Sequence, residues 1–570
     1  MLRLTRLRVG TAFAVGVAVL VWISRPPART VYVGGPVFTM DAENRVARGL
    51  ALVGDRIAAV GDEREMRAWA ETNRARVIEL EGRALLPGFV DAHSHFPAAG
   101  VDAIAADLNA PPIGTVRSID ELVARLGEWV PRKGAGEWVF GVGYDDTLLA
   151  ERRHPTRADL DRASTEHPIV AWHVSGHLCA LNSAALARVG LDAATPDPPG
   201  GRIRRDASGA PDGVLEETAT ELLRGVLPPP TLREAWAIVR EATRRTLAAG
   251  VTTAQNGYAE AAQLGPLLWL SRLGLLPMRI VVWPREEVAE RILAGDLDFD
   301  PPDPDRVRRG AVKLIADGSI QGYTAFLTQP YFVPPGDDPD YRGWPRIAPA
   351  ELNAQVERFH RAGWQIAVHG NGDAAIDEIL DAFEAAQRAY PRDDARHILV
   401  HAQMARDDQL DRMKRLGVIP SFFVLHTYYW GDRHRDVFLG PERAARISPT
   451  RSAEERGLRF TLHADTPVVP LEPLRILWAA VNRRTTSGAE LGPEQRIGVQ
   501  RALRAVTADA AWQHFEEATK GSLEPGKLAD LVILSRSPLD DPAHLDRIRV
   551  LETIVGGSSV WRAEDEADVR

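Results

Sequence analysis

Cysteine is almost absent from this sequence, in which Cys179 is the single one among 570 residues. A disulfide within the chain and a zinc site made of several thiolates are therefore excluded, so any bound metal must be held by nitrogen and oxygen atoms. Cys179 stands in the apolar run 178–181, and this setting favours a small buried side chain over a nucleophile.

The chain also lacks an excess of positive charge. Its formal net charge is -9 and its isoelectric point is near 6.0, whereas nucleic-acid-binding surfaces are basic and clustered. We therefore expect no nucleic-acid partner. The serine-hydrolase motif G-x-S-x-G and the zinc-helix motif H-E-x-x-H are missing as well, which excludes two further classes of hydrolase.

A long uncharged and mostly apolar run occurs at the N-terminus. Arg3, Arg6 and Arg8 precede residues 9–24, which is the layout of a secretory signal peptide or a signal anchor. No clear small-residue cleavage site precedes Thr30, which favours an uncleaved anchor with the arginines in the cytoplasm and the rest of the chain outside it. We expect the chain at the cell membrane through this anchor, or secreted or periplasmic. A cytoplasmic protein with an N-terminal extension is the alternative.

Length and composition predict one large domain and a smaller accessory domain. The chain is 45% hydrophobic and 26% charged, which is typical of soluble globular proteins, and 570 residues exceed one ordinary core. Short strand-like runs with glycine turns fill the region before residue 84 and return after residue 528, so both ends are expected to form one small β-sandwich domain. The predicted divisions are 1–29 for the signal peptide or membrane anchor, 30–84 for the first part of the β-sandwich, 85–505 for an inserted barrel, and 506–570 for a C-terminal helix and the second part of the β-sandwich.

Between the two ends, apolar β-branched runs alternate with amphipathic segments of helical length, which is typical of βα units around a parallel sheet. We expect an α/β fold in which eight strands close a (β/α)8 barrel, while two strands between residues 100 and 250 belong to an insertion. The ten candidate strands are 85–90, 138–142, 169–172, 251–254, 278–282, 311–315, 365–368, 397–400, 418–422 and 459–462.

Histidines and an acid occur at the C-terminal ends of several of these strands. They are His93, His95, His369, His401 and Asp465. A barrel brings the C-terminal ends of all its strands to one face, and an H-x-H segment in an extended chain points both imidazoles to the same side. A single histidine at a strand end is more often a hydrogen-bonded structural residue. The combination of all five therefore carries the prediction of a metal site.

The segments around these residues resemble those of a known family. Residues 86–95 read Leu-Pro-Gly-Phe-Val-Asp-Ala-His-Ser-His, and residues 521–532 read Gly-Ser-Leu-Glu-Pro-Gly-Lys-Leu-Ala-Asp-Leu-Val. Both resemble signatures of the amidohydrolase superfamily, the first at its first barrel strand and the second at its return into the β-sandwich. Four shorter segments, at 313–319, 369–373, 401–403 and 465–468, are similar to its subgroup with N-substituted formamide deformylase, amidohydrolase family 3. The resemblance covers residues 30–561 in the expected order.

This resemblance implies a hydrolase that cleaves a non-peptide C–N bond, such as an amide, formamide or N-acyl bond, with one or two divalent metal ions. Zinc is expected, with manganese as the alternative. The resemblance assigns His93 and His95 to one metal and His369 and His401 to a second, with Asp465 on the first. Bound metal lowers the pKa of a water molecule towards ~7, and Asp465 then takes its proton and later delivers it to the leaving nitrogen. Asp465 as a ligand only is the alternative.

Lys313 stands where the superfamily often has a lysine that reacts with carbon dioxide. The resulting carbamate would bridge the two metals with two anionic oxygens, which are hard ligands of the kind a dinuclear site needs. The alternative is an ion pair between Lys313 and a nearby acid such as Asp317. In that case the site would be mononuclear.

Four further residues are candidates for substrate contacts. His177 belongs to a Ser-Gly-His motif of the subgroup, with a structural loop histidine as an equal alternative. His426 and Trp430 lie in an aromatic-rich segment that suits an apolar or ring-bearing substrate group, and Tyr323 lies in a loop that could form a lid. Packing and a rigid loop are the alternatives for these three.

The expected partner is a small-molecule amide, and association into a homodimer is left open. Two other functions remain as alternatives. One is hydrolysis of an ester or a phosphotriester on the same site, because a barrel fold does not determine the reaction. The other is a binding protein that keeps the fold without the chemistry.

Overall fold

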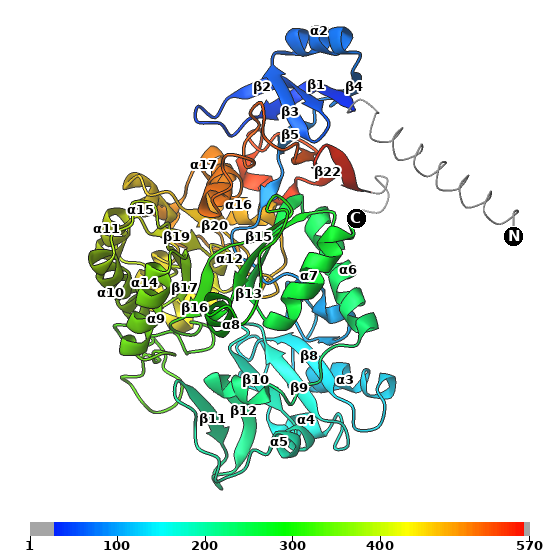
Figure 1. Cartoon of the computed structure of the whole chain (residues 1–570). Coiled ribbons are helices and arrows are strands. Elements are labelled where there is room, and N and C mark those ends of the chain that lie inside the picture. The colour runs from blue at the N-terminus through cyan, green and yellow to red at the C-terminus, as the bar shows by residue number, and fades with distance from the viewer. Residues whose placement is uncertain (1–27, 564–570) are drawn as a thin grey trace, which may run out of the picture.

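The computed structural model of the chain describes residues 28–563, and in it the two ends of the chain meet in one eight-stranded sheet (Figure 1). The strand order is β23-β22-β21-β5-β1-β2-β3, with β4 paired with β1. The N- and C-terminal parts join where β5 runs antiparallel to β21, with Leu85 opposite Ile533. The strands are β1 (Arg29–Phe38), β2 (Val46–Val53), β3 (Arg56–Gly61), β4 (Arg76–Glu79), β5 (Ala84–Pro87), β21 (Leu531–Leu534), β22 (Val550–Val555) and β23 (Ser558–Arg562).

Helix α2 (Glu63–Asn73) covers part of this sheet. It begins at a capping box, in which Asp62 accepts from the backbone of Glu65 and the Glu65 side chain accepts from the backbone of Asp62. Its Met66 and Ala70 are buried against residues of β1 and β2. The helix thus buries apolar side chains at the end of the molecule that is drawn uppermost in Figure 1.

Two parallel sheets form the centre of the molecule. One has four strands in the order β15-β14-β13-β6, and the other has five strands in the order β16-β17-β18-β19-β20. All neighbouring pairs run parallel, so within each sheet the C-terminal ends of the strands lie at one edge. The strands are β6 (Phe89–Val90), β13 (Val251–Ala259), β14 (Arg279–Pro284), β15 (Val307–Arg309), β16 (Val312–Ile315), β17 (Ile366–Gly370), β18 (Ile398–His401), β19 (Ile419–Phe422) and β20 (Thr461–Leu462).

The two parallel sheets contact each other on both sides. On one side β16 touches the four-stranded sheet through a single bridge at Lys313. On the other side the backbone N–H of Asp465 donates to the oxygen of His93 at 3.1 Å, and the N–H of His95 donates to the oxygen of Thr466 at 2.8 Å. The segments after β6 and β20 therefore lie side by side, although the hydrogen-bonded ladders of the two sheets remain separate.

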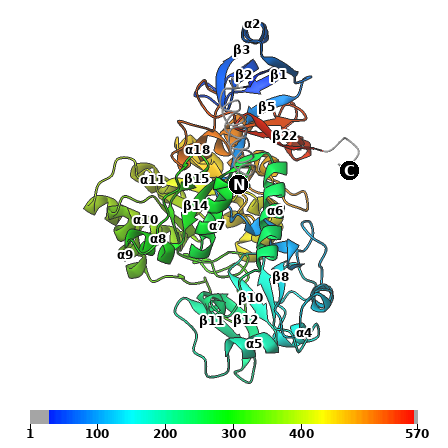
Figure 2. The same ribbon diagram turned by 45° about the vertical axis from the view of Figure 1, so that its right-hand side comes forward.

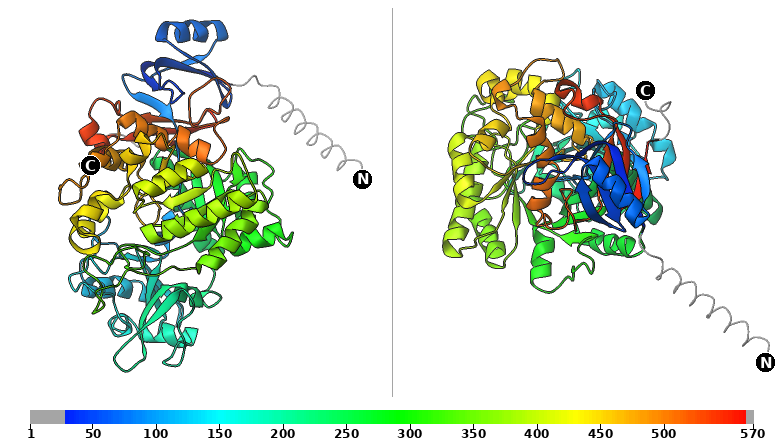
Figure 3. Two further views of the ribbon diagram at one scale, coloured as in Figure 1. Left: turned by 90° about the vertical axis from the view of Figure 1, so that its left-hand side faces the viewer. Right: turned by 90° about the horizontal axis from the view of Figure 1, so that it is seen from above.

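Helices cover the outer faces of the parallel sheets (Figures 1 and 3). In α10, Ile376, Ile379 and Phe383 are buried at helical spacing, which gives the helix one apolar face towards the sheet. The helices of this part are α6 (Leu232–Ala248), α7 (Ala261–Arg272), α8 (Glu286–Leu293), α9 (Pro349–Arg361), α10 (Asp373–Ala389), α11 (Asp407–Leu416), α12 (His426–Tyr429), α13 (Gly431–Arg433), α14 (Gly440–Ala445), α15 (Thr450–Glu455), α16 (Pro473–Asn482), α17 (Val499–Ala505) and α18 (Ala508–Gln513).

An insertion between β6 and β13 forms a further sheet of six strands, in the order β11-β12-β10-β9-β8-β7. It is drawn in cyan and teal at the end of the molecule opposite to the eight-stranded sheet (Figures 1 and 2). Two of the candidate strands, 138–142 and 169–172, correspond to β8 and β9 of this insertion. Its elements are β7 (Ala106–Asp107), α3 (Ile119–Gly127), β8 (Val139–Tyr144), α4 (Arg157–Asp161), β9 (Ile169–His173), β10 (Leu178–Leu181), α5 (Ser183–Val189), β11 (Gly201–Arg205) and β12 (Pro211–Glu217).

The predicted strand 85–90 is two strands in the structure. β5 belongs to the eight-stranded sheet and β6 belongs to the four-stranded parallel sheet, and Gly88 separates them. A Cβ atom on Gly88 would lie 2.2 Å from Cγ2 of Thr252, so only glycine lets the chain pass β13 at this distance. The prediction of one strand was wrong because a continuous apolar run shows burial without showing which sheet provides it.

The predicted signal peptide or anchor at 9–24 lies outside the described residues, so that expectation stays a prediction. Among residues 28–563, none of the helices combines the length and the hydropathy that a membrane span requires.

Candidate metal centre

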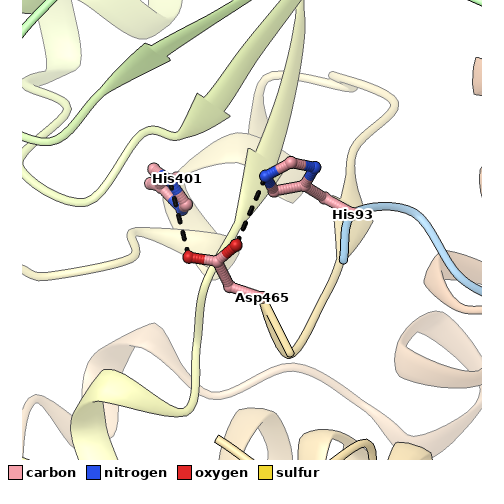
Figure 4. A group of neighbouring side chains, drawn as sticks. All are labelled: His93, His401 and Asp465. Atoms are coloured by element: carbon pink, nitrogen blue, oxygen red, sulfur yellow. Dashed lines mark ion pairs between the residues drawn. The ribbon is translucent and has the colours of Figure 1, made fainter. Parts of the chain in front are cut away.

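His93 and His95 lie in the segment that follows β6, and both imidazoles face the same carboxylate oxygen. His95 Nε2 lies 3.1 Å from Asp465 Oδ1, and His93 Nε2 lies 3.3 Å from the same atom. The His93 side chain is fully buried, whereas that of His95 is 30% exposed. Figure 4 shows His93 and Asp465 pointing towards one another from segments that are far apart in the sequence. The imidazoles of His93 and His95 thus both face Asp465 Oδ1, in agreement with the orientation expected for an H-x-H segment.

Strands β17 and β18 bring two more imidazoles to this point. Gly370 lies opposite His401 in their parallel ladder, so His369 and His401 stand at adjacent strand ends. His401 Nε2 lies 2.9 Å from His369 Nδ1 and 3.9 Å from Asp465 Oδ2 (Figure 4). His401 and Asp465 have positive φ angles of 73° and 55°. Such backbone conformations cost residues with a side chain about 1–3 kcal/mol and cluster at functional sites.

Lys313 points from β16 to the same group of side chains. Its Nζ lies 2.9 Å from His93 Nε2, and burial lowers the pKa of Lys313 to about 8. The proposed alternative partner, Asp317, accepts instead from the backbone N–H groups of Phe326, Asn371 and Gly372. Lys313 therefore faces the histidines, and the described residues contain no ion pair between Lys313 and Asp317.

Hydrogen bonds show which ring nitrogen of two histidines carries the proton. Gln255 Oε1 accepts from the backbone N–H of Ser94 and lies 2.9 Å from His93 Nδ1, so Nδ1 is the protonated nitrogen and donates to it. His369 Nε2 lies 3.0 Å from the backbone oxygen of Gly318, which can only accept. His93 Nε2 and His369 Nδ1, which face the other side chains of the centre, are therefore free to donate a lone pair to a metal.

Burial and charge set the protonation states in the centre. Burial lowers the pKa of His93, His369 and His401 well below the usual value. Burial acts to raise the pKa of Asp465, but the imidazoles of His401, His95 and His93 outweigh it and hold this pKa well below its usual range. At pH 7 neutral imidazoles thus surround an anionic carboxylate, and these are the states in which both side chains bind metal ions.

The donor atoms fit a divalent metal. One ligand atom each from His93, His401 and Asp465 lie within 4.8 Å of one another. Bond lengths of about 2.0–2.1 Å put two ligands of a tetrahedral ion roughly 3.3 Å apart. The separation of 2.9 Å between the His401 and His369 nitrogens and that of 3.3 Å between His93 and Asp465 are close to this value. A set of imidazoles and a carboxylate suits zinc, and manganese accepts the same ligands.

A cavity of about 1060 Å³ opens over the centre. His93, His95, Lys313, His369, His401 and Asp465 all line it. Apolar side chains form much of its wall and come from the insertion as well as from the central part of the chain: Ile113, Val142, Trp172, Val174, Leu223 and Val469. The centre therefore opens into a space that is large enough for a small organic molecule.

Comparison with protein families matches residues 76–561 to a profile described as "Amidohydrolase family". The chain belongs to the amidohydrolase family. The match runs from β4 to β23 and so includes both ends of the eight-stranded sheet, the insertion and the parallel sheets. It confirms the family that the sequence motifs indicated.

Individual proteins are similar to this chain over nearly its whole length. N-substituted formamide deformylase of Arthrobacter pascens is 30% identical over 537 residues, which cover 91% of this chain and 96% of the relative. The putative amidohydrolase YtcJ of Bacillus subtilis (strain 168) is 26% identical over 556 residues, covering 94% and 99%. Among solved structures, an uncharacterized metal-dependent hydrolase from Pyrococcus horikoshii OT3 superimposes with a TM-score of 0.71 at 26% identity, covering 91% and 99%.

The four predicted substrate residues of this amidohydrolase lie in different surroundings. His177 lines the cavity, with its ring centre 4.9 Å from that of His369. His426 lines a small crevice beside the centre. Among the described residues, Trp430 and Tyr323 line neither the cavity nor the crevice. Trp430 donates to a carboxylate of the insertion, and Tyr323 packs against other aromatic rings. Substrate contacts by Trp430 and Tyr323 thus stay predictions without a supporting contact.

The structure also reveals partners of the centre that were not predicted. Gln255 holds His93, His463 Nε2 lies 3.1 Å from His401 Nδ1, and Glu217 Oε2 lies 2.9 Å from His177 Nδ1. Two of these residues could have been found from the sequence, because Gln255 is a polar residue in a buried strand and His463 directly follows the run 459–462. Glu217 could not have been found in this way, because its partner lies across the insertion.

Gln255 provides a test of how the first histidine is oriented. Gln255→Leu removes the acceptor of the His93 Nδ1 proton, so zinc binding is expected to weaken about 10–100-fold. The affinity is measured by competition with a metal-binding dye. Gln255→Glu keeps an acceptor oxygen and serves as the matched control, with an affinity near that of the wild type. Equal zinc affinities of the leucine variant and the wild type would mean that Gln255 does not orient His93.

Proposed function

We propose that this amidohydrolase cleaves a C–N bond in a small non-peptide amide, such as a formamide or another N-acyl compound. The observation that carries the proposal is the position of Asp465, whose two oxygens face the imidazoles of His93, His95 and His401 beneath the cavity. A carboxylate in this position can bind a metal and exchange a proton with a substrate. The name of the Arthrobacter pascens relative, N-substituted formamide deformylase, supports this type of bond.

The proposed metal ligands are His93, His95 and Asp465 for one ion, and His369 and His401 for a second. Zinc is the first choice and manganese the second. A bound ion supplies a Lewis acid that polarises the substrate carbonyl and lowers the pKa of a water molecule towards ~7. The spacing of the donor atoms and the unprotonated nitrogens that face the centre support this assignment.

Lys313 is proposed to carry a carbamate. Its neutral amine would form an N–C bond with carbon dioxide and release one proton, which leaves two anionic oxygens in place of an ammonium. Burial lowers the pKa of Lys313 to about 8, so a larger share of the amine is unprotonated at neutral pH. The contact between Lys313 Nζ and His93 Nε2 supports the proposal, because an ammonium at 2.9 Å would compete with a cation for the same lone pair.

Asp465 is proposed to move the protons. Its carboxylate takes a proton from the attacking water, and it then protonates the leaving nitrogen as the tetrahedral carbon collapses. The second step matters because a neutral amine leaves far more easily than an amide anion. His95 Nε2 lies 3.1 Å from Asp465 Oδ1, so both atoms are placed to bind the same ion.

The cavity supports a substrate with an apolar group on nitrogen. Four arginines reach its wall, but each of them is already engaged by carboxylates of the chain: Arg224, Arg244, Arg245 and Arg346. They are therefore poorly suited to bind a free anionic group. We propose that the acyl carbon lies at the histidines and that the N-substituent packs against the apolar wall, with His177 beside it.

The two parallel sheets are proposed to be the halves of a (β/α)8 barrel. The bridge between Lys313 and Arg285, which follows β14, and the backbone hydrogen bonds of Asp465 and His95 support this closure, because they connect the two sheets on both sides. A closed barrel would bring all C-terminal strand ends to one face.

A substrate panel tests the proposed function. Zinc- or manganese-loaded protein is assayed with N-formyl and N-acetyl amides that carry a methyl group, an apolar ring or a carboxylate on nitrogen, and with matched esters and a phosphotriester. We expect amide cleavage, with kcat/KM about 10–100-fold higher for the apolar ring than for methyl, since burying a ring contributes roughly 1.5–3 kcal/mol. Faster turnover of the esters or the phosphotriester than of every amide would assign another reaction. No turnover by metal-loaded protein would favour a binding protein.

A further inference from the structure

A second group of buried acids and imidazoles lies in the insertion. Asp145 and Asp146 directly follow β8, and His173 is the last residue of β9. The two strands are parallel neighbours in which Tyr144 lies opposite His173, so the three side chains meet at adjacent strand ends. One ligand atom from each of Asp145, Asp146 and His173 lies within 4.8 Å of the others. This group shares no residue with the candidate metal centre.

Two atoms of the group face each other without a hydrogen bond. His173 Nε2 and Asp146 Oδ1 are 3.2 Å apart, yet both are buried atoms without a hydrogen-bond partner. The His173 side chain is completely buried. A buried imidazole nitrogen and a buried carboxylate oxygen left unsatisfied are each unfavourable, and such groups call for a further partner such as an ion or a water. Their separation is close to the roughly 3.3 Å between two ligands of one tetrahedral ion.

The other atoms of these side chains are held by neighbours. His173 Nδ1 accepts from the backbone N–H of Ser175 at 3.2 Å and lies 2.8 Å from Ser175 Oγ, so Nε2 carries the ring proton and faces the group. A metal can bind Nε2 once that proton has moved to Nδ1, where Ser175 Oγ accepts it. Asp145 accepts from Thr147 through Oδ1 and from the indole N–H of Trp430 through Oδ2, at 2.6 and 2.7 Å. Oδ1 accepts a second bond from the backbone N–H of Thr147, so Oδ2 is the oxygen with a lone pair left for a further ligand. Outer contacts of this kind orient metal ligands in known sites.

His154 completes the surroundings of Asp146. Its Nε2 lies 3.5 Å from Asp146 Oδ2, and its Nδ1 lies 3.0 Å from the hydroxyl of Tyr144.

Neither carboxylate of the group is paired directly with a lysine or an arginine in the part of the chain that the structure describes. Within residues 28–563, the only salt-bridge partners of Asp146 are His154 and His173. Asp145 and Asp146 are 2% and 8% exposed. Buried charges in proteins are paired or coordinate metals, and around these carboxylates imidazoles are the only salt-bridge partners among the described residues.

We propose that Asp145, Asp146 and His173 bind a divalent metal ion that is separate from the candidate metal centre. Two carboxylates and one imidazole suit zinc or manganese. The ion fixes the segment after β8 to the end of β9, and the bond from Trp430 to Asp145 links that segment to the region of α12. Since His173 also lines the cavity, the ion holds part of the cavity wall in place.

Anomalous X-ray diffraction tests this site in the full, unmodified chain. Crystals are grown with zinc or with manganese, and data are collected at the absorption edge of each metal. We expect an anomalous peak about 2.0–2.3 Å from His173 Nε2 and from oxygens of Asp145 and Asp146. The absence of such a peak in both kinds of crystal would overturn the proposal, whatever metal the candidate centre holds.

Metal content in solution gives a second test. Asp146→Asn preserves the shape of the side chain but removes its charge, and we expect one metal ion fewer per chain than in the wild type. Asp212→Asn, which changes a half-buried carboxylate of the same insertion outside the group, is the matched control and should keep all metal. If Asp146→Asn fails to fold, His173→Gln replaces it. Wild-type metal content in a folded variant would overturn the proposal.

A variant of the candidate metal centre distinguishes the metal bound there from the metal bound by the group in the insertion. His93→Gln removes a proposed ligand of that centre and should lower its metal content. Adding Asp146→Asn in this background should remove one further ion per chain. A His93→Gln chain that binds no metal at all would contradict a separate site.

Discussion

Asp465→Asn is expected to lower kcat/KM for amide hydrolysis by ~10² to 10⁴, the range that general acid–base groups contribute. Asparagine has the shape of aspartate but cannot hold the proton that passes from water to the leaving nitrogen. The backbone should tolerate the change, because Asp465 has a φ angle of 55° and asparagine is among the side chains that adopt this region most readily. The loss should therefore be seen in a folded protein, as checked by circular dichroism.

Asp394→Asn is the control for this variant. Asp394 is an exposed carboxylate paired with Arg396, and its replacement should leave activity unchanged. Metal content is measured in both variants, since Asp465 is also a proposed ligand. Wild-type activity of Asp465→Asn would remove this residue from the mechanism, and the proposed hydrolysis would need another proton acceptor.

Removing the metal with a chelator is expected to abolish hydrolysis, and adding zinc or manganese should restore it. Without the cation the neutral imidazoles of His93, His369 and His401 cannot polarise a carbonyl, and the attacking water keeps a pKa near its bulk value of about 15.7. Activity is followed with the best amide of the substrate panel, and metal content by mass spectrometry. Full activity in protein without detectable metal would contradict the proposed chemistry.

The same experiment examines Lys313. If a carbamate is needed, zinc should restore activity more completely in buffer with bicarbonate than in buffer freed of carbon dioxide. Lys313→Arg should recover no activity in either buffer, because a guanidinium stays cationic and does not form the carbamate. Equal recovery of the wild type with and without bicarbonate would exclude the carbamate and leave the requirement for metal intact.

The central strands could be predicted because each is a short apolar run between helical segments. The run 397–400 corresponds to β18, in which all four residues are buried. The run 365–368 likewise corresponds to β17. In a parallel sheet that helices cover on the outside, such strands are apolar on both faces, and this pattern is local in the sequence. The approximate positions of eight of the nine strands in the two parallel sheets therefore follow from the local sequence, whereas β15 and four of the six strands of the insertion were not predicted.

The sheet to which each strand belongs could not be predicted from the local sequence. The run 85–90 reads as one strand, but it contributes β5 to one sheet and β6 to another, with the change at Gly88. What decides this change is the close approach of Gly88 to Thr252, a residue far along the chain. A local pattern contains no information about such an approach.

The sequence by itself determined the family of this protein. It also indicated the strand ends that carry its histidines and the candidate ligands His93, His369, His401 and Asp465. These are properties of short segments, in which residue type and spacing are sufficient. Only the tertiary structure decided that Gln255 holds His93 and that the insertion forms part of the cavity wall. Only the tertiary structure brings Asp145, Asp146 and His173 together as well. The reason is physical: a hydrogen bond or a shared ligand position depends on distances between side chains that packing brings together, and the order of residues does not specify those distances.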